Sequence, residues 1–132
     1  MLNTAAKLQS ATPVFLVHDI ATTMAWYDDI LGFKGEAVPR TPPHSFAILQ
    51  RDEVVLFLQQ LSGYQKPDLY AKRGGGVWDS YIRTDDVKRL YETLKDRDDV
   101  TVVHPLHRQP YGQIEFEIQD PNGYILVFAE RT

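Results

Sequence analysis

The chain has 132 residues, a net charge of −4 and no cysteine. This length suits one domain with a sizeable hydrophobic core, so we expect residues 1–132 to form a single domain. An acidic chain without a clustered basic face argues against nucleic-acid binding. The lack of cysteine excludes disulfides, thiol nucleophiles and Cys-based zinc sites. Residues 1–13 contain no apolar segment and no run reaches transmembrane length, so we expect a cytoplasmic protein without a membrane partner.

The first half of the chain reads as a strand, a helix and further strands. The segment "PVFLVHDIATTMAWYDDILGF", residues 13–33, gives a short strand, a helix start at Asp-Ile, and Gly32 as the residue that ends the helix. The apolar residues at helical spacing are Ile20, Met24, Tyr27 and Leu31. Two strands follow, "SFAILQ" and "VVLFLQQ", and "RDE" between them predicts a tight hairpin.

The second half repeats this pattern. The segment "SYIRTDDVKRLYETLKDR", residues 80–97, gives a strand and then a helix that Thr84 or Asp85 is expected to cap. One face of this helix is formed by Val87, Leu90, Tyr91 and Leu94. The strands "VTVVHPL", "GQIEFEIQ" and "YILVFAE" follow, and "DPNG" joins the last two.

Matching positions of the two halves are separated by nearly constant distances along the chain. Asp19 and Asp86 are 67 residues apart, and Leu56 and Leu126 are 70 apart. The sequence therefore predicts two modules, about 12–60 and 78–130, each a strand, a helix and three strands. Residues 61–77 between them are polar and rich in glycine, and they suit either a linker or a mobile flap over a site.

The segments "HDIATTMAWYDDILGF" and "YGQIEFEIQDPNGYILVF" together resemble the vicinal oxygen chelate superfamily, which includes glyoxalase I, extradiol dioxygenases and bleomycin-resistance proteins. The resemblance covers roughly residues 12–130. It implies an α+β fold in which two tandem βαβββ modules form a curled mixed sheet around one cavity. It also implies a homodimer.

Enzymes of the superfamily hold a divalent metal at four strand positions, usually with His, Glu or Gln. By the local motifs, the resemblance carries these positions onto Thr12, Phe57, Asp79 and Val127. Only Asp79 is a strong metal ligand, and one carboxylate does not retain a divalent ion in water. We therefore predict that the pocket contains no metal and needs no cofactor.

Alternation along the last strand decides which residues face the cavity. Ile125 and Val127 are expected to face it, and Leu126 and Phe128 to face the helices. A mostly apolar pocket with a few converging polar groups is typical of ligand sites. The expected ligand-binding residues are Phe57, Asp79, Tyr81, Arg83, Glu115 and Val127.

Three further features leave alternatives open. Glu115 and Glu117 alternate with apolar residues, which fits either a solvated strand face or a cavity that binds a cationic group. Asp79 and Arg83 can form a simple ion pair along their strand. "HPLH", residues 104–107, resembles a metal-binding pair only weakly, because its proline excludes the helical geometry that aligns two such histidines.

Two functions compete. The leading hypothesis is a protein that binds a small organic molecule, and sequesters it, in the manner of the bleomycin-resistance branch. The alternative is a lyase, isomerase or dioxygenase with an atypical metal set of Asp79, Glu115 or Glu117, and His44. Enzyme activity is the less favoured reading because the family's ligands are replaced. A dimerising scaffold with no small ligand is the third possibility.

Overall fold

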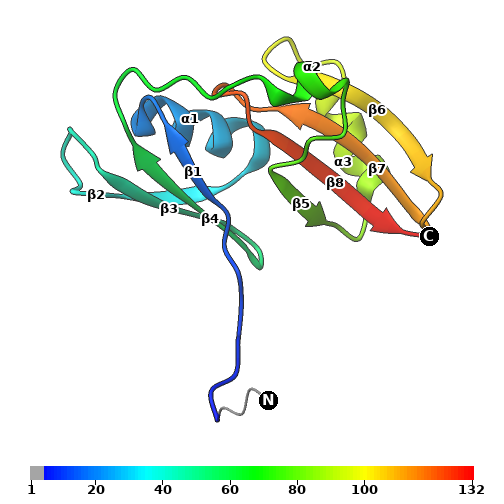
Figure 1. Ribbon diagram of the computed structural model, residues 1–132, viewed down its shortest axis with the longest axis horizontal. Coiled ribbons are helices and arrows are strands. Elements are labelled where there is room, and N and C mark those ends of the chain that lie inside the picture. Colours follow the sequence, from blue (N-terminus) through cyan, green and yellow to red (C-terminus); the bar gives the residue numbers. More distant parts are fainter. Residues whose placement is uncertain (1–4) are drawn as a thin grey trace.

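The structure is a computed structural model that describes residues 5–132, so the first four residues of the expected single domain lie outside the described part. Two four-stranded mixed sheets lie side by side, with strand orders β1-β4-β3-β2 and β5-β8-β7-β6 (Figure 1). The first module comprises β1 (Val14–Val17), α1 (Ile20–Leu31), β2 (Lys34–Val38), β3 (Phe46–Arg51) and β4 (Val54–Gln60). The second comprises β5 (Ser80–Arg83), α3 (Val87–Leu94), β6 (Thr101–Gln109), β7 (Gln113–Gln119) and β8 (Ile125–Arg131), and α2 (Leu69–Arg73) lies between the modules.

The predicted α+β fold with two βαβββ modules is confirmed. The two sheets remain separate, and within residues 5–132 they do not curl into one continuous sheet around a cavity (Figure 1). The polar segment between the modules also contains the short helix α2, which the sequence analysis did not predict. No helix of residues 5–132 has the length and apolar character needed to cross a membrane.

Both long helices begin with the same capping interaction. The carboxylate of Asp19 accepts a hydrogen bond from the Thr22 backbone N–H at 2.9 Å, and that of Asp86 accepts from Arg89 N–H at 3.1 Å. The cap of α3 is therefore Asp86, and the expectation of Thr84 or Asp85 was wrong by one or two residues. Helix α1 ends as predicted at Gly32, whose φ of 70° is the left-handed conformation that glycine adopts without strain.

A side chain at the end of each module's last strand completes the helix start. Gln60 Oε1 accepts from the Ile20 N–H at 2.7 Å, and Glu130 Oε1 accepts from the Val87 N–H at 2.9 Å. The strand registers match as well, because β1 pairs with β4 in parallel in the first module as β5 pairs with β8 in the second. The repeat read from the sequence is therefore present in the structure, with the predicted residue offsets.

Helices α1 and α3 each cover one face of their sheet, and the opposite face, called the open face below, contacts neither of these two helices. In the second module Leu126 and Phe128 belong to the hydrophobic core, and the Phe128 ring lies 5.3 Å from that of Phe116. The alternate residue Val127 lies on the opposite face, beside Tyr81 of β5 and Glu117 of β7. The predicted alternation along β8 is therefore confirmed.

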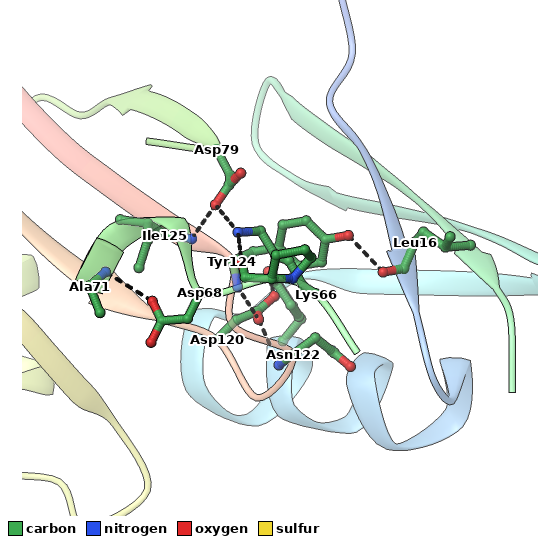
Figure 2. A network of polar contacts seen from close by, with 11 residues as sticks. Leu16, Lys66, Asp68, Ala71, Asp79, Asp120, Asn122, Tyr124 and Ile125 are labelled. Carbon is green, nitrogen blue, oxygen red and sulfur yellow. Dashed lines mark hydrogen bonds and ion pairs between the residues drawn. The ribbon is translucent and has the colours of Figure 1, made fainter. Parts of the chain in front are cut away.

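The turn "DPNG" joins the second module to the first. The Tyr27 hydroxyl of α1 donates a hydrogen bond of 2.6 Å to Asp120 Oδ2, and both residues are buried. The Tyr124 hydroxyl donates to the Leu16 carbonyl of β1 at 2.7 Å (Figure 2), and the Tyr124 ring stacks on Phe15 at 4.1 Å. This turn thus fixes the position of one module against the other.

Candidate functional site

An open hollow of about 650 Å³ lies at the end of the second sheet, on the face that α3 does not cover. Its aromatic rim is partly exposed, since Trp78 keeps 40% and Tyr111 52% of its surface accessible. The residues that line it are Trp78, Tyr81, Arg83, Tyr111, Gly112, Gln113, Arg131 and Thr132. Aromatic faces together with a few polar groups are typical of a site for a small organic molecule.

A buried carboxylate lies behind the tyrosines of this hollow. Glu115 on β7 is fully buried, and its Oε2 accepts hydrogen bonds from the hydroxyls of Tyr81 at 2.5 Å and Tyr111 at 2.9 Å. Its Oε1 accepts from the Gln109 side-chain amide at 3.0 Å. Three neutral donors thus stabilise one charge, which is the usual requirement for a buried carboxylate.

The tyrosines serve this carboxylate as donors over the whole physiological pH range. Burial, together with the hydrogen bond and charge of Glu115, raises the pKa of Tyr111 to about 12. The same causes, in the same order, raise the pKa of Tyr81 well above its ordinary value. Both hydroxyls therefore keep their protons and hold the Glu115 carboxylate in one orientation.

A second buried carboxylate, Glu117, lies two residues along the same strand. Its Oε1 has no hydrogen-bond partner within residues 5–132, and the same holds for the buried Oε1 of Gln113. Burial, followed by the charge of Glu117, raises the pKa of Tyr70 on α2, so the Tyr70 hydroxyl lies near this carboxylate. The open face of β7 is therefore a row of buried polar side chains, and the alternative of a solvated strand face is excluded.

His107 on β6 faces the first of these carboxylates. It is the register partner of Glu115, and its Nε2 lies 3.9 Å from Glu115 Oε1. The strand is irregular around Pro105, and the rings of His104 and His107 lie 3.7 Å apart. The two histidines of "HPLH" therefore lie together on an irregular strand, so the helical geometry that the proline excludes is not needed to bring them close.

The residues at the family's four metal positions do not fit a metal. Asp79 Oδ2 accepts from the Ile125 N–H at 2.8 Å and lies 3.6 Å from Lys66 Nζ, so this carboxylate already has a cationic partner (Figure 2). Its partner is Lys66 and not the Arg83 that the sequence suggested. Phe57 and Val127 offer no ligand atom. Thr12, the remaining position, lies just before β1 and adds only a hydroxyl.

The alternative metal set is not brought together either. His44 Nδ1 lies 2.7 Å from the Pro39 carbonyl, and Asp79 is held by Ile125 and Lys66. Within residues 5–132, histidine, aspartate and glutamate side chains bring three or more possible metal-ligand atoms close together in one place. This group is His107, Glu115 and Glu117. The structure therefore does not bring together the set of Asp79, Glu115 or Glu117, and His44 that the alternative enzyme reading required.

The predicted ligand residues fall into four places, and one of them, Asp79, is held by the Ile125 N–H and Lys66 outside the lining of the hollow. Tyr81 and Arg83 line the hollow, while Glu115 and Val127 lie buried beside it. Phe57 lies on the open face of the first sheet, so the chain does not gather all six residues into one pocket.

Several residues of the site were missed by the sequence analysis. Arg131 follows Val127 and Ala129 on the same face of β8, so alternation alone was enough to find it. Gln109 and His107 depend on the register of β6 against β7, which "HPLH" disturbs. No local pattern indicated that register.

A family model described as the Glyoxalase/Bleomycin resistance protein/Dioxygenase superfamily matches residues 9–128. The chain belongs to this superfamily. No match was found among curated proteins. The resemblance inferred from the two sequence segments is thereby confirmed for nearly the whole chain.

Solved structures share the fold at low sequence identity. A glyoxalase-related enzyme from Clostridium phytofermentans is 18% identical with a TM-score of 0.73, over 98% of this chain and 100% of that one. A superfamily member from Sphaerobacter thermophilus is 20% identical with a TM-score of 0.71, over 95% and 98%. A bleomycin-binding protein from bleomycin-producing Streptomyces verticillus, solved with copper(II)-bleomycin, is 21% identical with a TM-score of 0.66, over 93% and 96%. These similarities establish the fold.

Proposed function

We propose that this superfamily member binds, and sequesters, a small organic molecule in the hollow at the end of the second sheet, with no metal at the family's four positions. The observation that carries the proposal is the rim of Trp78 and Tyr111, two large exposed aromatic side chains beside a hollow of about 650 Å³. Planar ligands stack on such faces, and the hollow has the size of ordinary small-molecule sites. The binding of bleomycin by a protein of the same fold supports this class of function.

The charges at the rim favour a ligand with an acidic group. Arg83 and Arg131 both line the hollow, and neither forms an ion pair with a carboxylate within residues 5–132. A guanidinium offers several donors in a planar fork that matches a carboxylate. The net charge of −4 by itself favours a cationic ligand. The carboxylates that produce this charge are spread over the molecule, however, whereas Arg83 and Arg131 face the hollow.

Three matched probes test this proposal: naphthalene-2-carboxylate, the neutral naphthalene-2-carboxamide, and the cationic 2-naphthylmethylammonium ion. Binding is measured by NMR titration of the full chain in the presence of a chelator. We expect the carboxylate to bind at least about tenfold more tightly than the amide, because a charge-assisted bidentate pair adds about 1.4 kcal/mol or more.

The Arg83→Gln variant should lose that advantage, and Arg89→Gln on α3, which pairs with Asp86 away from the hollow, should keep it. Equal binding of all three probes, or no binding, would refute the proposal. Tighter binding of the ammonium ion than of the carboxylate would indicate that the ligand is cationic.

We further propose that a second copy of the chain covers the open face of the first sheet. That face is apolar, and Val14, Val38 and Ile48 on it keep 49%, 52% and 41% of their surface exposed. An apolar stripe of this kind is typical of an interface. Phe57 lies on the same face, in register with Val14 and Ile48, so a homodimer of this kind would bury it at the interface. With no spanning helix in the described chain, a cytoplasmic location is part of the proposal.

Sedimentation analysis tests the dimer. Ile48→Glu should convert a dimer into a monomer, because a buried charge costs several kcal/mol at an apolar interface. Leu69→Glu is the matched control, since Leu69 is similarly exposed at 47% but lies on α2. A monomeric wild-type protein, or equal dissociation by both variants, would contradict the proposal.

A further inference from the structure

We propose that the chain has a binding site for a first-row divalent metal ion, formed by His107 Nε2 and the carboxylates of Glu115 and Glu117. This inference goes beyond the binding of an organic molecule and does not depend on it. The site uses β6 and β7, and none of the family's four metal positions contributes to it. It therefore differs from the site whose loss the sequence predicted.

The ligand atoms are already gathered. One atom from each of the three side chains lies within 4.8 Å of the others, and the His107 Nε2 to Glu115 Oε1 distance is 3.9 Å. Ligands at about 2.1 Å from a tetrahedral ion are roughly 3.4 Å apart, so side-chain adjustments of less than about 1.5 Å close the site. The strands support this arrangement, because His107 and Glu115 are register partners and Glu117 lies on the same face of β7.

The tautomer of His107 suits a metal ligand. Its Nδ1 lies 2.8 Å from the Pro105 carbonyl oxygen. A carbonyl only accepts hydrogen bonds, so in the neutral ring Nδ1 carries the proton and Nε2 keeps its lone pair. Nε2 faces Glu115, and a backbone carbonyl on the other ring nitrogen is the arrangement that commonly orients histidine ligands of metals.

The electrostatics of the cluster call for a cation. Glu115 and Glu117 are 0% and 2% exposed, and Glu117 Oε1 has no hydrogen-bond partner within the described chain. No lysine or arginine of residues 5–132 lies within ion-pair distance of either carboxylate. Two buried negative charges without a cation are costly, and a divalent ion between them offsets that cost.

The Gln109 side-chain amide lies between two of the proposed ligands of the ion. Its nitrogen lies 3.0 Å from His107 Nε2 and 3.0 Å from Glu115 Oε1, so it donates to two of the prospective ligands from between them. Rotation of this amide by half a turn would direct its oxygen to the same point as a fourth ligand. The His107 side chain keeps 20% of its surface exposed, which gives the ion a route from solvent.

The donor set selects the class of ion. One imidazole with two carboxylates suits zinc, cobalt and manganese, whereas magnesium and calcium prefer oxygen ligands alone. We therefore expect Zn²⁺ and Co²⁺ to bind and Mg²⁺ to bind far more weakly.

The test is titration of the chelator-treated full chain with Zn²⁺ by calorimetry and with Co²⁺ by its visible absorption. One ion per chain is expected. Glu117→Gln keeps the shape of the side chain and removes its charge, and His107→Ala removes the imidazole. Each should weaken binding by at least about tenfold, because even the loss of an outer-shell partner of a metal ligand has an effect of that size.

His104→Ala is the matched control, because the His104 ring lies next to that of His107, tilted by 41°, but does not belong to the cluster. It should change the affinity by less than about twofold. Thermal unfolding of each variant in chelator shows whether the variant folds. If His107→Ala does not fold, the metal affinity of Glu117→Gln alone tests the site. The proposal is overturned when wild-type protein binds no Co²⁺, or when binding survives in Glu117→Gln. The naphthalene-2-carboxylate titration in chelator reports on the hollow alone, so either proposal can fail without the other.

Discussion

The contact between Tyr27 and Asp120 predicts a loss of stability whose size depends on pH. Tyr27→Phe removes the hydroxyl that donates the 2.6 Å hydrogen bond to Asp120 Oδ2 across the two modules. Both residues are buried, with Tyr27 0% and Asp120 5% exposed, so water does not replace the lost donor. A hydrogen bond to a charged group contributes about 1.5–3 kcal/mol, and we expect a loss of about 2 kcal/mol in the free energy of unfolding near neutral pH.

The dependence on pH follows from the pKa of Asp120. Burial raises this pKa above its ordinary value, and the Tyr27 hydrogen bond acts in the opposite direction. Without Tyr27 the pKa of folded Asp120 rises further. A carboxyl group whose pKa is raised by folding favours the folded state below its unfolded pKa, and this contribution is lost as pH rises through the folded pKa. The cost of Tyr27→Phe should therefore fall to about 1 kcal/mol, the value of a neutral hydrogen bond, where Asp120 is protonated.

Tyr124→Phe is the control for this reasoning. It removes a hydroxyl that also joins the modules, but the acceptor is the uncharged Leu16 carbonyl at 2.7 Å. The pKa of Tyr124 is raised to about 12, chiefly by burial, so neither partner titrates at acid or neutral pH. Urea unfolding at about pH 3, below the ordinary pKa of an aspartate, and at about pH 7.5 should show a cost of about 1 kcal/mol at both values. An equal cost of Tyr27→Phe at the two pH values would refute the assigned role of the Asp120 charge.

Other predictions concern the repeated features of the two modules and are measured by chemical denaturation. Asp19→Ala and Asp86→Ala each remove a helix cap and should each lower the free energy of unfolding by about 1 kcal/mol, whereas asparagine at either position should cost only a few tenths. Glu130→Gln should be nearly neutral, because the first module uses a glutamine for the same contact, and Glu130→Ala should cost about 1 kcal/mol. Gly35→Ala should cost about 1–3 kcal/mol, because the added methyl group would overlap the Leu49 side chain. A Gly35→Ala protein as stable as the wild type would show that the Leu49 side chain of β3 moves aside easily.

The local features of the fold were predictable because they depend on neighbouring residues. Asp19 before the first helix, Gly32 after it, and the alternation along β8 all act within one element. The repeat reinforced the prediction of the helix starts, since Asp19 and Asp86 occupy matching positions of the two modules. The error at Thr84 and Asp85 arose because three consecutive residues offered an oxygen for the same cap, and only the backbone conformation selects Asp86.

The candidate site was less predictable because its members come from different strands. The sequence placed Glu115 on one face of β7, but its burial depends on Tyr81 from β5 and Tyr111 from the loop before β7. The position of Phe57 depends on how the two sheets lie relative to each other. The turn from Asp120 to Gly123 sets that arrangement through its contacts with α1, and its sequence indicates only a reversal of the chain.

The duplicated modules show how one fold carries two different surfaces. In the first sheet Ile48 pairs with Phe57, and at the matching place in the second sheet Glu117 pairs with Val127. The repeat thus places an isoleucine on one open face and a carboxylate on the other, in the same register. The apolar face lowers its free energy by contact with another apolar surface, whereas buried carboxylates need hydrogen-bond donors or a cation. The backbone repeat therefore determines where on each module a ligand or a partner protein can bind. A few side chains on the open faces then determine whether a module binds a ligand or a partner protein.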